Sequence, residues 1–169
     1  MCKIKKRILL YCIFILFLLT SCSSLNDAVV VKNGNINDYK YVIINPTETV
    51  KTTYGAGTTG TYSGFYYSAT ETKTVNPKDV IAGYLIKKGF IILSDVDEKL
   101  KNQTMIITYG ESNRHSHGLG YAIEVTLQFI SSDTKELICT STADGYGETE
   151  ADNIRIALTR ALDALFEQN

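Results

Sequence analysis

The segment YAIEVTLQF, residues 121–129, constrains the fold more than any other part of the chain. Apolar and polar side chains alternate along it, and successive side chains of a β-strand point to opposite faces of a sheet. One face of this strand would carry Tyr121, Ile123, Val125, Leu127 and Phe129, and the other Ala122, Glu124, Thr126 and Gln128. A strand with one apolar and one polar face is typical of an antiparallel sheet that is covered on one side only.

The neighbouring segments predict the rest of the sheet. The polar turn SSDTK leads into ELICTSTA, residues 136–143, which we expect to return beside 121–129 as a hairpin. Three further strands, rich in β-branched or aromatic residues, are expected at 39–45, 90–94 and 104–110. The apolar run AVVV at 28–31 is a candidate for a short additional strand. These segments predict a mostly antiparallel sheet of about four to six strands.

Two segments have the signals of amphipathic helices. In the first, residues 76–89, Asn76 can cap the helix, Pro77 suits its first position and Gly89 can end it. In the second, Thr149 can cap and Asp152 completes a pattern close to a capping box. The apolar stripes are Val80, Ile81, Tyr84 and Leu85 in the first helix and Ile154, Leu158, Ala161, Leu162 and Leu165 in the second. The fold class is therefore α+β, a two-layer sandwich with both helices on one face of the sheet.

The stretch GAGTTG, residues 55–60, has the glycine spacing of loops that bind dinucleotides. Such a loop must open directly into a helix, whose amide groups meet the phosphates. The residues that follow are instead β-branched and aromatic, so we expect the tip of a β-hairpin inserted at 47–74 and no bound nucleotide. The hairpin carries a dense set of aromatic residues, which form a candidate binding surface: Tyr54, Tyr62, Phe65, Tyr66 and Tyr67.

The remaining polar clusters give weaker signals. His115 and His117 would point the same way on an extended segment, but a zinc site needs three or four ligands and only Glu111 is near. We expect a solvated hairpin loop there, with no metal and no cofactor. Acidic residues crowd the start of the second helix, where they would repel a phosphate: Asp144, Glu148, Glu150 and Asp152. No set of nucleophile, base and orienting residue emerges, so we expect no enzyme.

The beginning of the chain has three blocks in order: basic residues at 3–7, an apolar run at 8–19, and LTSC ending at Cys22. The apolar run is shorter than the roughly 20 residues of a membrane-spanning helix and has the length of a signal-peptide core. This order resembles the lipobox signal of bacterial lipoproteins. The resemblance implies cleavage before Cys22, acylation of that residue with fatty acids, and anchoring of the protein to a membrane through lipid. Ser23 implies the outer membrane, and leaves the side that the domain faces open.

The blocks divide the chain into a signal peptide at 1–21, the lipidated Cys22 with a tether at 22–38, and one α+β domain at 39–169. Removing the four leader cations from 17 leaves 13 basic residues against 18 acidic ones, a net charge near −5. This net charge argues against nucleic acid as a partner, because nucleic acid requires a basic surface. With Cys22 lipidated, Cys139 has no partner for a disulfide within the chain, and we expect a buried strand residue.

Several segments resemble one group of envelope proteins: YVIINP at 41–46, GFIIL at 89–93, NQTMIITYGES at 102–112, and the final segment from DGYGE to the alanine-rich helix. Together they are similar to the amino-terminal domain of TolB-type proteins and to lipoproteins that activate penicillin-binding proteins; the insertion at 47–74 departs from that pattern. The resemblance implies a non-enzymatic, lipid-anchored domain that binds an envelope protein partner or assists an assembly. The alternative is a module that binds saccharide or peptidoglycan through the tyrosine-rich hairpin.

Overall fold

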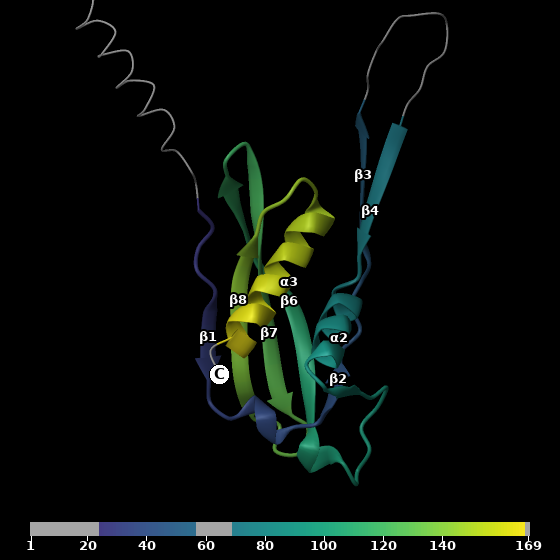
Figure 1. Ribbon diagram of the computed structural model, residues 1–169, viewed down its shortest axis with the longest axis vertical. Coiled ribbons are helices and arrows are strands. Elements are labelled where there is room, and N and C mark those ends of the chain that lie inside the picture. Colours follow the sequence, from purple (N-terminus) through teal and green to yellow (C-terminus); the bar gives the residue numbers. More distant parts are fainter. Residues whose placement is uncertain (1–23, 57–68, 168–169) are drawn as a thin grey trace, which may run out of the picture.

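The computed structural model describes residues 24–56 and 69–167. A six-stranded sheet in the order β1-β8-β7-β6-β2-β5 forms the body, and a separate two-stranded ribbon, β3–β4, extends from it (Figure 1). The strands are β1 (Val29–Lys32), β2 (Tyr41–Ile44), β3 (Val50–Ala56), β4 (Ala69–Val75), β5 (Ile91–Ile92), β6 (Thr104–His117), β7 (Gly120–Ser131) and β8 (Leu137–Gly145). The helices are α2 (Pro77–Lys87) and α3 (Glu150–Glu167), with short 3-10 turns at Ile36–Asp38 and Lys101–Gln103.

Strands β6, β7 and β8 form a continuous antiparallel meander, and β1 pairs antiparallel with the outer edge of β8. On the other side of the meander, β2 lies parallel to β6 and β5 lies parallel to β2. Parallel neighbours need a crossover connection, and α2 provides it between β2 and β5. The expectation of a mostly antiparallel sheet is confirmed, with this parallel edge added.

Both helices pack on the same face of the sheet, as predicted (Figure 1). Helix α3 covers β7 and β8, while α2 lies beside α3 against β2 and β5. The whole predicted stripe of α3 is fully buried, as are Ile81 and Leu85 of α2. Cys139 is buried in β8, as predicted, and the hydroxyl of Ser141 donates to the carbonyl of Ala161 at 2.6 Å. The α+β fold follows from this one-sided burial.

The predicted helix signals are present at the ends of both helices. The side chain of Asn76 accepts a hydrogen bond from the Lys78 amide at 3.0 Å, and Gly89 follows α2 with a φ of +92°. At the start of α3, the hydroxyl of Thr149 accepts from the Asp152 amide at 3.2 Å. The Asp152 carboxylate in turn accepts from that hydroxyl at 2.8 Å, so the two side chains hold each other in place.

Three local expectations were wrong. The strand expected at 90–94 shrinks to Ile91–Ile92, although the Leu93 amide still bonds to the carbonyl of Val42. Strand β6 continues well past residue 110 to His117, because the chain turns only at the glycines beyond it. Within β7, Ala122 is buried and Tyr121 is 40% exposed, the reverse of the burial expected for these two residues.

The segment expected to act as a tether contributes to the sheet. Val29 pairs with Thr142, and the register continues to Lys32 opposite Cys139. Asn26, which precedes this strand, is held by one side-chain and one backbone hydrogen bond. Its side chain donates to the Asp144 carboxylate at 2.8 Å, and its carbonyl accepts from Arg160 at 2.6 Å. From Asn26 onward, the chain is therefore fixed to the domain.

Candidate functional site

We call the end of the domain that holds the β6–β7 turn, the β8–α3 loop and the adjoining part of β3 the hairpin end. An open cleft of about 360 Å³ lies there. Thr52 of β3, Leu119 and Tyr121 of the hairpin, and Tyr146 and Glu148 of the loop are among the residues that line it. The hydroxyl oxygen of Thr52 is buried and has no hydrogen-bond partner among the described residues.

The β6–β7 turn is tight and presents an apolar tip. Gly118 has a φ of +57°, which a two-residue hairpin turn of type II′ requires at its first position. The second position is Leu119, whose side chain is completely exposed. Tyr146 lies over the base of this turn: its ring centroid is 4.7 Å from that of His117, and a Cβ added to Gly120 would lie 3.3 Å from its ring.

Asn153 of α3 organises the β8–α3 loop. Its buried side chain donates to the carbonyl of Tyr121 at 2.9 Å and accepts from the Gly147 amide at 2.5 Å. Gly145, the last residue of β8, allows helix and strand to approach closely, since a Cβ at this position would lie 1.9 Å from the Asn153 carbonyl oxygen. Asn153 was not among the residues predicted from the sequence. The only signal for it was a side-chain amide in the first turn of the second helix.

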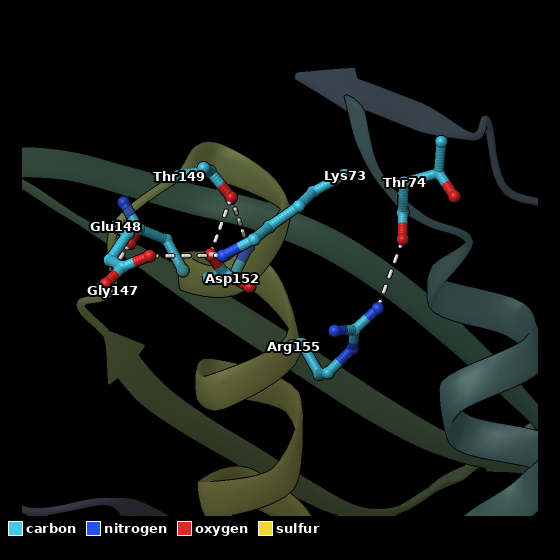
Figure 2. Close-up of polar contacts among 8 residues, drawn as sticks. Lys73, Thr74, Gly147, Glu148, Thr149, Asp152 and Arg155 are labelled. Atoms are coloured by element: carbon cyan, nitrogen blue, oxygen red, sulfur yellow. Dashed lines mark hydrogen bonds and ion pairs between the residues drawn. The ribbon is translucent and has the colours of Figure 1, made fainter. Parts of the chain in front are cut away.

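The ribbon is fastened to α3 by two cations (Figure 2). The ammonium of Lys73 lies 2.9 Å from the carboxylate of Asp152 and 3.2 Å from that of Glu148, while Arg155 donates to the carbonyl of Thr74 at 3.1 Å. The hydrogen bond from Lys73 is the main reason why the pKa of Asp152 lies below its usual value. These contacts fix where the lower part of the ribbon stands beside the cleft.

A third cation, Arg114, forms ion pairs on the other side of the loop. The guanidinium of Arg114 in β6 lies 2.7 Å from Glu111 and 2.5 Å from Glu150. Its hydrogen bonds to these carboxylates raise the pKa of Arg114. The acids at the start of α3 are thus paired with cations from distant strands, a feature that the expected self-contained turn did not include.

Asp144 does not belong with those acids. It is buried at the end of β8, where one carboxylate oxygen accepts from Asn26 and lies 3.7 Å from Nε2 of His115. The other oxygen has no hydrogen-bond partner within the described residues. Arg160 donates to the carbonyl of the same residue at 2.5 Å. This cluster joins the N-terminal segment to the sheet.

The predicted site residues are therefore placed as follows. His115 and His117 lie in β6 and not in a loop, and each faces its own partner, Asp144 or Tyr146. In the described ranges, no group of three or more His, Cys, Asp or Glu side chains gathers in a geometry for a metal ion. Tyr54 lies in β3. The other predicted residues lie outside the described residues: Cys22, Gly57, Gly60, Tyr62, Phe65, Tyr66 and Tyr67.

The face of the sheet opposite the helices is a second candidate surface, which we call the helix-free face. An apolar row crosses four adjacent strands on it, made of directly paired residues: Leu137, Ile130, Ile106 and Ile43. The next rows toward the hairpin end are polar, with Thr140, Gln128 and Thr108 in one and Thr142 and Thr126 in another. At the β1 edge, Val29 and Val31 pair with Thr142 and Thr140 and are 60% and 53% exposed.

No protein-family model matches the chain, and no curated protein matches it. Two solved structures of the PelC dodecamer from Paraburkholderia phytofirmans are similar at 10% sequence identity with a TM-score of 0.45. The match to a single-substitution variant of PelC in one crystal form covers 82% of this chain and 96% of the PelC chain. The match to PelC in another crystal form covers 81% of this chain and 96% of the PelC chain. A likeness of this degree gives no argument about what the chain binds. In the part of the chain that the structure describes, no helix is long and apolar enough to cross a membrane.

Proposed function

We propose that this protein is a non-enzymatic, lipid-anchored domain of the bacterial envelope that binds a protein partner through its helix-free face. The observation that supports this most is the apolar row on that face. Ile43, Ile106 and Ile130 are only half-buried, and Leu137 is 37% exposed. Apolar side chains that continue across four strands form one surface, unlike the single exposed residues found on any protein.

The polar rows beside the apolar one suit a protein partner. Protein interfaces combine an apolar centre with a polar rim that supplies hydrogen bonds. On this face the hydroxyl of Thr126 lies 2.9 Å from that of Thr142, and Thr108 donates to the side chain of Gln128 at 3.3 Å. These hydrogen bonds already orient the polar side chains, and a row of oriented donors and acceptors beside an apolar row fits the side of a folded protein.

The charged groups at the hairpin end support a structural role over catalysis. Lys73 and Arg114 each join carboxylates across separate elements and hold the ribbon and the loop in place. The lipid anchor is supported by the order of blocks that ends at Cys22. Two or three acyl chains on one residue anchor a protein stably, because each buried methylene contributes about 0.8 kcal/mol.

The partner can be tested by photo-crosslinking in intact cells of the native host. A photoreactive amino acid is placed at Leu137 or Val31 on the helix-free face, and at Ile86 of α2 as the matched control, since Ile86 is apolar and 59% exposed on the helical side. We expect one discrete adduct of the same mass increment from Leu137 and Val31 and none from Ile86. Adducts of equal yield from all three positions, or none from Leu137 and Val31, would contradict a partner on this face.

The anchor is tested separately, by mass spectrometry of the N-terminal peptide from membrane fractions. We expect a peptide that begins at Cys22 and carries fatty acyl chains. A polypeptide that still begins at Met1 without lipid would remove the envelope assignment, whatever the crosslinking shows.

A further inference from the structure

We propose that the hairpin end of the domain rests on the lipid bilayer to which the chain is anchored, with Leu119, Tyr121 and Tyr146 at the membrane–water interface. The inference depends on the proposed lipid anchor at Cys22. It adds an orientation: the strands stand perpendicular to the membrane plane, so the helix-free face points sideways and not into the lipid.

The chain enters the domain at the hairpin end. Asn26 is bonded to Asp144, and the same carboxylate oxygen of Asp144 lies 3.7 Å from His115, which is near the β6–β7 turn. Figure 1 shows the described chain beginning at the same end of the domain as that turn and the start of α3. An anchor that precedes Asn26 therefore pulls this end, and not the opposite one, toward the membrane.

The tether between the proposed anchor and the domain is short. Asn26 is the fourth residue after Cys22, and a fully extended chain spans at most about 14 Å over these four steps. The β6–β7 hairpin itself projects beyond His115: two strand residues to His117 add roughly 7 Å, before the turn. Taking Asn26 to be at the level of His115, a fully extended tether would reach at most roughly 7 Å beyond His117, and a less extended tether would reach less far.

The tip of the hairpin has the chemistry of a membrane-interface residue set. Leu119 is completely exposed at the turn, and Tyr121 and Tyr146 remain 40% and 37% exposed close by. Tyrosine is enriched at membrane interfaces, where its ring meets the acyl boundary and its hydroxyl meets water. At the tip of the β6–β7 turn, an exposed leucine with tyrosines behind it has the order of polarity that an interface presents.

The charges around the tip determine which lipid surface fits. Lys73 and Arg114 are shared among four acids: Glu111, Glu148, Glu150 and Asp152. The excess of carboxylates would be repelled by anionic lipid, so contact should be strongest with a zwitterionic surface and weaken as anionic lipid is added.

The test uses the absence of tryptophan from the chain, which makes a single introduced tryptophan an unambiguous reporter. The full chain with Leu119→Trp is expressed with its own leader, purified from membranes and reconstituted in vesicles of phosphatidylcholine, with and without bromine on the acyl chains. Leu137→Trp, at the opposite end of β8, is the matched control. Circular dichroism checks that both variants fold, and mass spectrometry checks for lipid on Cys22.

We expect the emission of the Leu119→Trp variant to shift to shorter wavelength on reconstitution and to lose intensity with brominated lipid, while Leu137→Trp changes in neither respect. Lipid on Cys22 without quenching of Leu119→Trp, or with equal quenching of both variants, would overturn the proposed orientation and leave the anchor intact. If Cys22 carries no lipid, the anchor itself fails, and this orientation fails with it.

Discussion

The contact between Gly145 of β8 and helix α3 yields the sharpest prediction about this fold. A Cβ at this position would lie 1.9 Å from the carbonyl oxygen of Asn153 and 2.5 Å from the amide nitrogen of Ala157. Both are backbone atoms of α3, so no side-chain rotation can relieve the clash. Ordinary contact begins near 3.4 Å, which means that the helix would have to move by roughly 1.5 Å.

Such a shift would disturb the packing of the buried stripe of α3 against β7 and β8. Overpacking a core costs about 1–3 kcal/mol, and a clash with backbone belongs at the upper end of that range. For Gly145→Ala we expect a loss of about 3 kcal/mol in the free energy of unfolding. In a domain of this size, that corresponds to a melting temperature roughly 6–12 °C lower.

The assay is thermal and urea unfolding followed by far-ultraviolet circular dichroism. Gly83→Ala is the control, because it adds the same methyl group within α2, where a Cβ meets nothing within 4 Å. That variant should be more stable by about 0.5–1 kcal/mol, since alanine favours the helix over glycine. A Gly145→Ala protein that melts at the wild-type temperature would refute the reasoning from close backbone approach.

Three further predictions concern buried or paired groups. Lys73→Met should lower the free energy of unfolding by about 1 kcal/mol near neutral pH. The depressed pKa of Asp152 adds stability that is present above the unfolded value of about 3.9 and is lost as the pH falls through the lower folded value. Urea titrations should therefore show the difference between variant and wild type shrinking as the pH falls below about 3.9, and an unchanged difference would contradict the ion pair. Ser141→Ala, which removes the buried hydrogen bond to α3, should cost about 1 kcal/mol by the same urea assay, and no loss would mean that this bond contributes nothing net. Burial raises the pKa of Cys139 to about 11, so at pH 8 iodoacetamide should leave this thiol unmodified in the folded protein and alkylate it in urea, as mass spectrometry can verify; equal rates in both states would contradict its burial.

The sequence predicted the parts of the fold that depend on local patterns. The alternation at 121–129 and the stripe of α3 each have a fixed period, so the buried face of each element follows from the order of residues alone. The caps at Asn76 and Thr149 were also predictable, because a cap bonds to amides only two or three residues away.

The candidate surfaces were less predictable. The tyrosine-rich hairpin drew attention because its aromatic residues are adjacent in sequence, and Tyr62, Phe65, Tyr66 and Tyr67 lie outside the described residues. The cleft at the hairpin end is built from segments that are far apart in the chain, including Thr52 and Tyr146. The apolar row of the helix-free face was hidden as well, since each strand contributes one residue to it and the row exists only once the register is known.

By itself, then, the sequence determined the type of each main element, the helix-covered face of most of them, and so the two-layer α+β class. Only the tertiary structure decided that β2 lies parallel to β6, that Asn26 is bonded to Asp144 across 118 residues, and that Lys73 reaches Asp152 across 79. The physical reason is that hydrophobic periodicity is a property of neighbouring residues, whereas these contacts depend on how all the strands and helices share one core.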